Sequence, residues 1–352
     1  WVAADWTENN VTFPAEKENA EINWGALKTL VAEKNITATK ELTTEESTLV
    51  FNELEAGAYL VIASGKTTQY SVMGVATYKY DENSNLLAPL AAEVDAKGEG
   101  YTVTKTLNGE KTLVNRGDEL TFNIESVFPS FAEGTEKRTV SVTDIPTGQY
   151  VNDVTVYVGD MENALTVGQD YTLSYNKGSE SLPAKENESV TVNFTSDYIG
   201  TENAHAAQAI KVVVKTIVTD VTTIKNEATG SHDSIPTEVF TETGSITIKK
   251  VDEDQKVLSG AQFSFKKVNE DANLTFVKVS DGVYKLAMAD EEVAVDVLEV
   301  AAEGDNKGIL KVQGLGQDEY EIVEVKAPDG YSVVEVDNVT LSLEEKDEEV
   351  TV

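Results

Sequence analysis

The stretch "YEIVEVKAPDGY" runs from Tyr320 to Tyr331 and places one glutamate on an apolar strand that ends at a Pro-Asp-Gly turn. The side chains of a strand alternate between its two faces, so Tyr320, Ile322 and Glu324 share one face. The two apolar neighbours predict that this face is buried. Because burying an unpaired carboxylate costs free energy, the pattern indicates that Glu324 has a specific partner inside the fold.

Short runs rich in Val, Thr, Ile, Tyr and Phe recur along the whole chain, with Gly, Asn and Asp clusters between them. Examples are "AYLVIAS", "ELTFNI", "AIKVVVKTIV" and "GSITIKKV". This pattern is typical of antiparallel β-sandwiches. Apolar residues at helical spacing occur in "WGALKTLVAEKN", from Trp24 to Asn35. We therefore expect an all-β protein with a minor helical element.

The chain has 352 residues, which is long for a single domain. Two Gly-containing junctions, "AKGEG" (96–100) and "TETGS" (241–245), each precede a new strand. They predict an N-terminal domain at 1–98, a middle domain at 99–243 and a C-terminal domain at 244–352. Each segment has the size of an immunoglobulin-like β-sandwich, so we expect tandem sandwiches in an elongated array.

Charge and composition exclude several classes of function. Lys and Arg number 28 against 62 Asp and Glu, and the net charge of −34 argues against binding to nucleic acid or anionic lipid. With no Cys and two His, we expect no disulfide, no metal and no cofactor. No apolar run reaches the roughly 18 residues of a membrane span. The opening "WVAADWTENN" does not resemble a signal peptide, so we expect a mature or trimmed segment.

The predicted middle and C-terminal domains both begin with a strand that carries a lysine on its apolar face. Val103 and Lys105 share a face in "YTVTKT", as do Ile248 and Lys250 in "SITIKK". A single lysine at a strand end could extend its amine to solvent, and a slip of one residue would turn Lys249 inward instead of Lys250. Recurrence at equivalent places favours two buried lysines.

These motifs carry a resemblance. "GSITIKKVDEDQKVLSGAQFSF" followed by "YEIVEVKAPDGY" resembles the collagen-adhesin B-type (CnaB) domain of Gram-positive surface proteins, with Glu324 as its E-box glutamate. "YTVTKTLNGEKTLVNRGDELTFNI", "VSVTDIPTGQY" and "TTIKNEATGSHDS" resemble the isopeptide-forming domain of sortase-assembled major pilins. "LVFNELEAGAYLVIASGKTTQYSVMGVATY" is similar to the first domain of those pilins. The resemblance covers nearly the whole chain and implies Cna-type sandwiches.

The resemblance implies a covalent reaction inside the fold. In that family a lysine amine condenses with an asparagine carboxamide and releases ammonia, while a neighbouring Asp or Glu catalyses the step. An apolar environment favours this chemistry because desolvation lowers the pKa of the amine and raises that of the acid. The family pattern assigns Lys105 and Asn226 as bonded partners joining first strand to last, with Asp144 as the acid, and it pairs Lys250 with Glu324.

The residues alone leave these assignments open. Asn226 could be a turn residue before Gly230, and Asp144 could be a turn former before Pro146. Glu324 could be an edge-strand carboxylate that faces water.

The amide partner of Lys250 is not identified in the sequence. In the family this asparagine lies in or just after the last strand, and here the last strand, "EEVTV", stops at Val352. Asn338 lies in what we expect to be the penultimate strand, so we do not assign it. We expect the partner to lie beyond Val352.

The resemblance also implies how the chain is used. Major pilins are joined head to tail by a sortase, which links a C-terminal LPXTG-type threonine to a lysine near the end of the first domain. Neither that sorting motif nor the usual Tyr-Pro-Lys form of the pilin motif is present in this sequence, and Lys97 in "AEVDAKGEG" stands at the matching place. Lys97 is the candidate linkage lysine, or else a solvated linker lysine.

The leading hypothesis is therefore a structural shaft subunit of a covalently polymerised, cell-wall-anchored pilus, with sortase and other pilin subunits as partners and no enzymatic turnover. The alternative is a wall-anchored adhesin or minor pilin that binds a host surface or matrix ligand. A carboxylate-pair hydrolase is disfavoured because neither a nucleophile elbow nor a histidine-based triad can be found.

Overall fold

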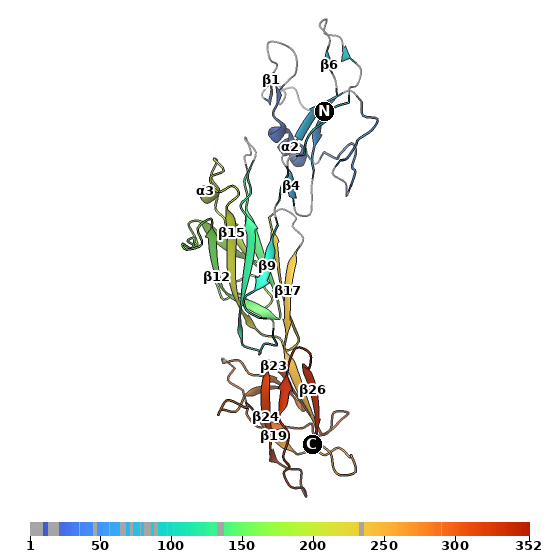
Figure 1. Cartoon of the computed structure of the whole chain (residues 1–352), viewed down its shortest axis with the longest axis vertical. Helices are drawn as coiled ribbons and strands as arrows, with labels where there is room; N and C mark the ends of the chain where they lie inside the picture. Colours follow the sequence, from blue (N-terminus) through green and yellow to red (C-terminus); the bar gives the residue numbers. More distant parts are fainter. Residues whose placement is uncertain are drawn as a thin grey trace.

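The computed structural model of the chain describes residues 10–12, 21–34, 36–44, 48–55, 57–63, 68–70, 73–77, 79–80, 86–87, 91–96, 98–100, 102–110, 112–131, 137–231, 236–289 and 291–352. Almost all its described regular structure is β-strand, and the molecule is elongated, with the N-terminal part and the C-terminal domain in opposite end regions (Figure 1). The predicted all-β class and elongated array of sandwiches are confirmed. Neither described helix has the length and hydrophobicity needed to cross a membrane.

The described residues of the N-terminal part form short, two-stranded sheets and helix α2. The pairs are β1–β2, β3–β5, β4–β8 and β6–β7. The bounds are β1 Val11–Thr12, β2 Glu21–Ile22, α2 Trp24–Glu33, β3 Ala58–Val61, β4 Thr68–Tyr70, β5 Met73–Ala76, β6 Lys79–Tyr80, β7 Leu86–Leu87 and β8 Gly98–Gly100.

Helix α2 corresponds to the helical pattern predicted from Trp24 onward and ends at Glu33. It packs against β5, where the indole of Trp24 lies so close to Gly74 that a Cβ there would overlap its ring atoms. Strand β8 pairs with β4, so the boundary expected after residue 98 falls inside a strand that belongs to the N-terminal sheets.

The middle domain is a sandwich of two sheets. One sheet has the strand order β12-β15-β10-β9, and the facing sheet has the order β13-β14-β11-β16-β17. Buried and less buried residues alternate along β10, β11 and β16, as expected for strands with one face toward a core. The bounds are β9 Thr104–Leu107, β10 Glu119–Val127, β11 Ser141–Thr147, β12 Gln149–Val158, β13 Tyr171–Tyr175, β14 Val190–Phe194, α3 Ser196–Ile199, β15 Ala209–Val218, β16 Thr223–Gly230 and β17 Thr237–Glu242.

The C-terminal domain is a second sandwich, with strand orders β20-β21-β23-β18-β26 and β22-β19-β24-β25. Its core is built from apolar side chains of both sheets, including Ile246, Phe263 and Leu310. The final strand, β26, runs parallel to β18, the first strand of the domain. The bounds are β18 Gly244–Lys249, β19 Gln262–Lys267, β20 Phe276–Ser280, β21 Val283–Leu286, β22 Leu298–Glu299, β23 Ile309–Leu315, β24 Asp318–Lys326, β25 Val339–Leu341 and β26 Asp347–Thr351.

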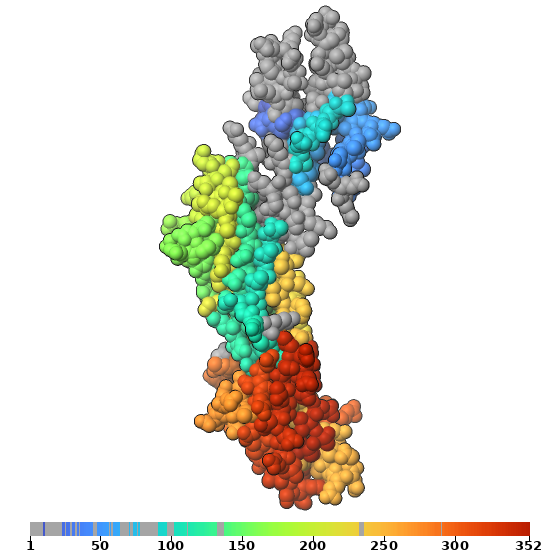
Figure 2. All heavy atoms as spheres, viewed as in Figure 1, coloured from blue at the N-terminus to red at the C-terminus, as the bar shows by residue number. Residues whose placement is uncertain are grey.

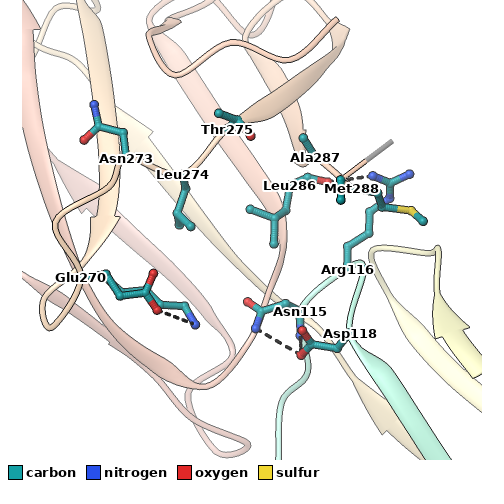
Figure 3. A pocket seen from close by; sticks show the side chains of 13 residues that line it. Asn115, Arg116, Asp118, Glu270, Asn273, Leu274, Thr275, Leu286, Ala287 and Met288 are labelled. Atoms are coloured by element: carbon teal, nitrogen blue, oxygen red, sulfur yellow. Dashed lines mark hydrogen bonds and ion pairs between the residues drawn. The ribbon is translucent and has the colours of Figure 1, made fainter. Parts of the chain in front are cut away.

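The middle and C-terminal domains are joined by more than the connection from β17 to β18. The loop between β9 and β10 reaches across the junction, and Leu113 packs into the apolar core of the C-terminal domain. Arg116, 6% exposed, donates hydrogen bonds to the carbonyl of Leu286 and pairs with the carboxylate of Glu291. The two domains therefore form a continuous body in Figure 2, with a cleft of about 350 Å³ beside Arg116 (Figure 3).

Candidate functional site

The middle domain brings together a lysine, a carboxylate and a carboxamide that lie far apart in sequence. Lys105 lies on β9, in one sheet, whereas Asp144 on β11 and Asn226 on β16 lie in the facing sheet. Inward-facing positions of all three strands meet in the core between the sheets. Asp144 and Asn226 lie within strands and are buried, so neither is the turn residue that the sequence left open.

The three side chains are in direct contact. Lys105 Nζ lies 2.8 Å from Asn226 Oδ1 and also donates to the carboxylate Oδ1 of Asp144. A third, longer contact of 3.3 Å joins the amine to the backbone carbonyl of Glu227. The residues are 4% (Lys105), 2% (Asp144) and 0% (Asn226) exposed, so this group of side chains is closed to bulk water.

Burial shifts the pKa values of the amine and the acid toward their neutral forms. Desolvation lowers the pKa of Lys105 and raises the pKa of Asp144, with each charge partly opposing the effect on the other. Two atoms of the group, Asp144 Oδ2 and Asn226 Nδ2, have no hydrogen bond of normal geometry to any described residue. The site therefore holds an amine, an acid and an amide with spare hydrogen-bonding capacity in a dry environment.

An aromatic side chain that the sequence analysis did not single out completes this site. The centroid of the Phe122 ring lies 5.0 Å from Lys105 Nζ, and Phe122 belongs to a small apolar cluster with Leu120, Val218 and Ile224. The ring excludes water from the amine and still offers a favourable face to any positive charge. The alternation in "ELTFNI" does predict an inward Phe122, but nothing in the sequence relates it to Lys105.

Asn226 is not on the last strand of the domain, contrary to the expectation that a Lys105–Asn226 pair would join first strand to last. Strand β17 follows β16 and pairs with it at the edge of the sheet. Most residues of β17 are only partly buried or exposed, so its apolar periodicity is weak and the sequence did not reveal it as a further strand of this sheet.

The C-terminal domain contains a second buried lysine and acid. Lys250 directly follows β18, and its Nζ lies 2.9 Å from Oε1 of Glu324 on β24, in the facing sheet. Both residues are 4% exposed. Glu324 is buried on the inward face of β24, so it is not a carboxylate that faces water. Lys249, the alternative in register, is half-buried on the opposite face.

The second oxygen of Glu324 has a different partner. Oε2 accepts a hydrogen bond of 2.9 Å from the backbone N–H of Val334, in the segment between β24 and β25. That oxygen is therefore held as an acceptor, and Oε1 is the oxygen that faces Lys250.

No asparagine side chain of the described residues bonds to Lys250. Asn338 is exposed, and its Nδ2 donates to Glu319 Oε1 at 3.0 Å. The end of β26 lies beside the lysine, because the N–H of Val352 donates to the carbonyl of Lys249 and the N–H of Val251 donates to the carbonyl of Val352. The C-terminal domain therefore holds the lysine and the acid of the pattern without the amide.

Within the described parts of the chain, no group of three or more His, Cys, Asp or Glu side chains is arranged to hold a metal ion. Lys97, the candidate linkage lysine, lies outside the described residues.

Comparison with known proteins places the fold. Residues 244–352 match the family model of the SpaA prealbumin-like fold domain. No curated protein matches the sequence. Among solved structures, the chain is similar to the Corynebacterium diphtheriae major pilin SpaA, with a TM-score of 0.56 and 14% identity over 86% of this chain and 81% of that chain. That structure is described as pointing to a modular pilus assembly and stabilizing isopeptide bonds.

Two further solved structures are similar at lower scores. They are the group B streptococcus pilus 2b backbone protein (TM-score 0.49, 21% identity, 70% of this chain and 96% of that chain) and the C. diphtheriae major pilin SpaD (TM-score 0.49, 18% identity, 86% and 77%). The resemblance to Gram-positive major pilins is confirmed at the level of the fold by the match to SpaA and by the C-terminal domain model.

Proposed function

We propose that this protein is a structural shaft subunit of a covalently polymerised cell-surface pilus, stabilised by self-catalysed lysine–asparagine isopeptide bonds. The observation that carries the proposal is the buried contact among Lys105, Asp144 and Asn226 across the core of the middle domain. The fold shared with a major pilin supports the same function.

The arrangement provides each component that an amide exchange requires. Neutral Lys105 Nζ attacks Cγ of Asn226, so a bond forms between Nζ and Cγ and the bond between Cγ and Nδ2 breaks. One proton leaves Nζ and one reaches Nδ2, with the Asp144 carboxyl group accepting the first and donating the second, and the products are the isopeptide and ammonia. The directions of both pKa shifts favour a neutral amine beside a protonated acid.

The position of the proposed bond would make the domain resistant to stretching. Lys105 lies on the first strand of the domain and Asn226 on the last but one, in opposite sheets. Tension applied to the chain ends would load a covalent bond before it separated the hydrogen-bonded strands, so the segment between these residues would not extend. A shaft subunit needs this resistance.

In the C-terminal domain we assign Glu324 as the acid and Lys250 as the nucleophile of a second bond. The 2.9 Å contact between Nζ and Oε1 and the shared burial support this assignment. We propose three domains as expected, keeping the limit between 243 and 244 and moving the first junction from residue 98 to the end of β8 at Gly100. Lys97 remains the proposed lysine for linkage by a sortase to the next subunit, which would give a cell-wall-anchored fibre outside the cell.

Mass analysis of the whole chain tests the proposal. The intact folded protein should weigh less than its sequence by one ammonia for each bond, and a tryptic digest should contain a branched peptide joining Lys105 to Asn226. The variant Lys105→Arg should restore the full mass of that site, whereas Lys215→Arg, at an exposed surface ion pair, should not change the mass deficit. A fully folded chain with unmodified Lys105 would refute the proposal.

A further inference from the structure

The middle domain buries a second carboxamide, that of Gln149, at the first residue of β12. Gln149 is 0% exposed. A buried side-chain amide is costly unless both its donor and acceptor groups are satisfied. Its Oε1 accepts from the hydroxyl of Thr216, also 0% exposed, at 2.5 Å, and its Nε2 donates to the backbone carbonyl of Lys225 at 2.9 Å. Gln149 thus joins its own sheet to β16 of the facing sheet.

The carbonyl that Gln149 binds belongs to the peptide group directly before Asn226. Fixing that peptide group limits the rotation of β16 at the residue whose carboxamide meets Lys105. On the other side of Asn226, the carbonyl of Glu227 accepts from Lys105 Nζ at 3.3 Å. The two backbone carbonyls that flank Asn226 are therefore both held by side chains from the opposite sheet.

The hydrogen bond from Gln149 lies where the neighbouring strand ends. Strand β11 ends at Thr147, the residue opposite Lys225 in its pairing with β16. The side-chain donor from the facing sheet therefore adds a hydrogen bond to β16 at the point where its pairing with β11 stops.

We propose that Gln149 is a positioning residue for the isopeptide reaction, holding the Lys225–Asn226 peptide group so that the Asn226 carboxamide meets the Lys105 amine. This inference rests on the proposed function. Gln149 does not touch the reacting atoms, and its effect is on geometry. A displacement of about 1 Å from a reactive arrangement can lower a rate by on the order of 100-fold.

The test measures how fast the bond forms in newly made full-length chain. Cell-free synthesis is stopped in denaturing acid at successive times, and the fraction that has lost ammonia from the Lys105 site is read by mass analysis. Gln149→Met removes both hydrogen bonds of the amide at similar volume, and we expect bond formation to slow at least ~10-fold. Thr216→Val is the matched control, because it removes a buried hydrogen bond from the same cluster but keeps the contact with Lys225. It should react at close to the original rate.

A background without the reaction separates positioning from folding. In Lys105→Met no bond can form, so the melting temperatures of Lys105→Met and of Lys105→Met with Gln149→Met give the purely structural effect of Gln149. Slow bonding in Gln149→Met together with a folded double variant supports the inference. Equal fractions of bonded chain in Gln149→Met and the original protein at every time would overturn it, as would loss of the fold in the double variant. If the original protein never loses ammonia from the Lys105 site, the proposed function itself fails.

Discussion

The two sandwich domains both bury a lysine next to an acid, but the groups around the two pairs differ. Each buries a lysine near its first strand against an acid from the facing sheet: Lys105 with Asp144, and Lys250 with Glu324. In the middle domain an asparagine amide meets the lysine, and one oxygen of the acid is left without a hydrogen bond in the described structure. In the C-terminal domain, Oε2 of Glu324 accepts from the N–H of Val334, and Oε1 lies 2.9 Å from Lys250 Nζ without a hydrogen bond of normal geometry.

The difference shows which feature marks a reactive site. A buried lysine–acid pair is costly because two charges lose their hydration, and it is weak evidence for stability alone. In the proposed reaction, the amide would allow the middle domain to remove this cost. Once Lys105 Nζ had become part of an isopeptide, it would carry no charge, and Asp144 could be protonated and neutral. In the described part of the C-terminal domain, no asparagine amide bonds to Lys250, and its Nζ lies 2.9 Å from Glu324 Oε1.

The largest expected effect comes from removing the acid of the middle site. Asp144→Ala should prevent bond formation and leave Lys105 buried without its partner, which costs about 3–5 kcal/mol in comparable buried pairs. The middle domain should then unfold at much lower denaturant concentration, and its mass deficit should vanish. Glu238→Ala, at an exposed ion pair with Lys225, is the control and should leave both properties unchanged. Retention of the mass deficit in Asp144→Ala would show that Asp144 is not the catalyst.

Lys105→Met also removes the bond. It should destabilise the middle domain less than Asp144→Ala, because it leaves no buried amine without a partner. The aliphatic part of the lysine is kept, and Asp144 can remain protonated. By analogy with disulfides, the lost cross-link should lower the free energy of unfolding by roughly 2–4 kcal/mol. In the original chain the middle domain should therefore melt after the C-terminal domain, and in Lys105→Met the gap should narrow or reverse. Calorimetry with limited proteolysis would assign the transitions. An unchanged order and spacing would contradict a covalent bond at Lys105.

Sequence periodicity predicted the inward-facing residues of the two sites, but it did not predict the residues that surround them. The inward directions of Lys105, Lys250 and Glu324 follow from the two-residue period of strands, and the family resemblance supplied Asp144 and Asn226. The periodicity could not reveal Gln149, because its partner, a backbone carbonyl in the facing sheet, depends on how the sheets pack.

No pattern in the sequence predicted the contact between the middle and C-terminal domains. Arg116 and Glu291 are separated by a domain boundary, and neither lies in a periodic pattern that would indicate a contact. Edge strand β17 was missed for a related reason, because only Thr241 among its residues is fully buried. Contacts that depend on the relative placement of sheets and domains thus lie beyond local patterning.

We expect the middle and C-terminal domains to unfold in separate transitions. A variant of Arg116 tests how strongly the joint couples them. Its guanidinium donates to the carbonyls of Thr219 and Leu286 and to both oxygens of Glu291. Arg116→Met should weaken the joint by about 1.5–3 kcal/mol, the range for hydrogen bonds to a charged group. We expect the calorimetric transitions of the two domains to separate further, and small-angle scattering to report a wider range of bending. Arg138→Met, away from the joint, should change neither.

The smallest expected effect is a dependence of this joint on pH. The hydrogen bonds from Arg116 are the largest cause that holds the pKa of Glu291 down to about 2, against 4.5 for an unperturbed glutamate. Because the folded pKa is depressed, the stabilisation is fully present above about pH 4.5 and is lost as the pH falls toward 2. The Arg116 amide donates to the carbonyl of Gly314 across the joint, so its protection against hydrogen exchange, relative to the intrinsic exchange rate at each pH, should fall over this window. Glu291→Gln should already show lower protection at neutral pH and should lose this acid-dependent decrease, since the glutamine cannot titrate. Glu188, whose pKa is also about 2 through hydrogen bonds from Ser179 and nearby amides, titrates in the same window within the middle domain. An acid response that persists in Glu291→Gln would assign the effect to that loop and leave the joint independent of pH.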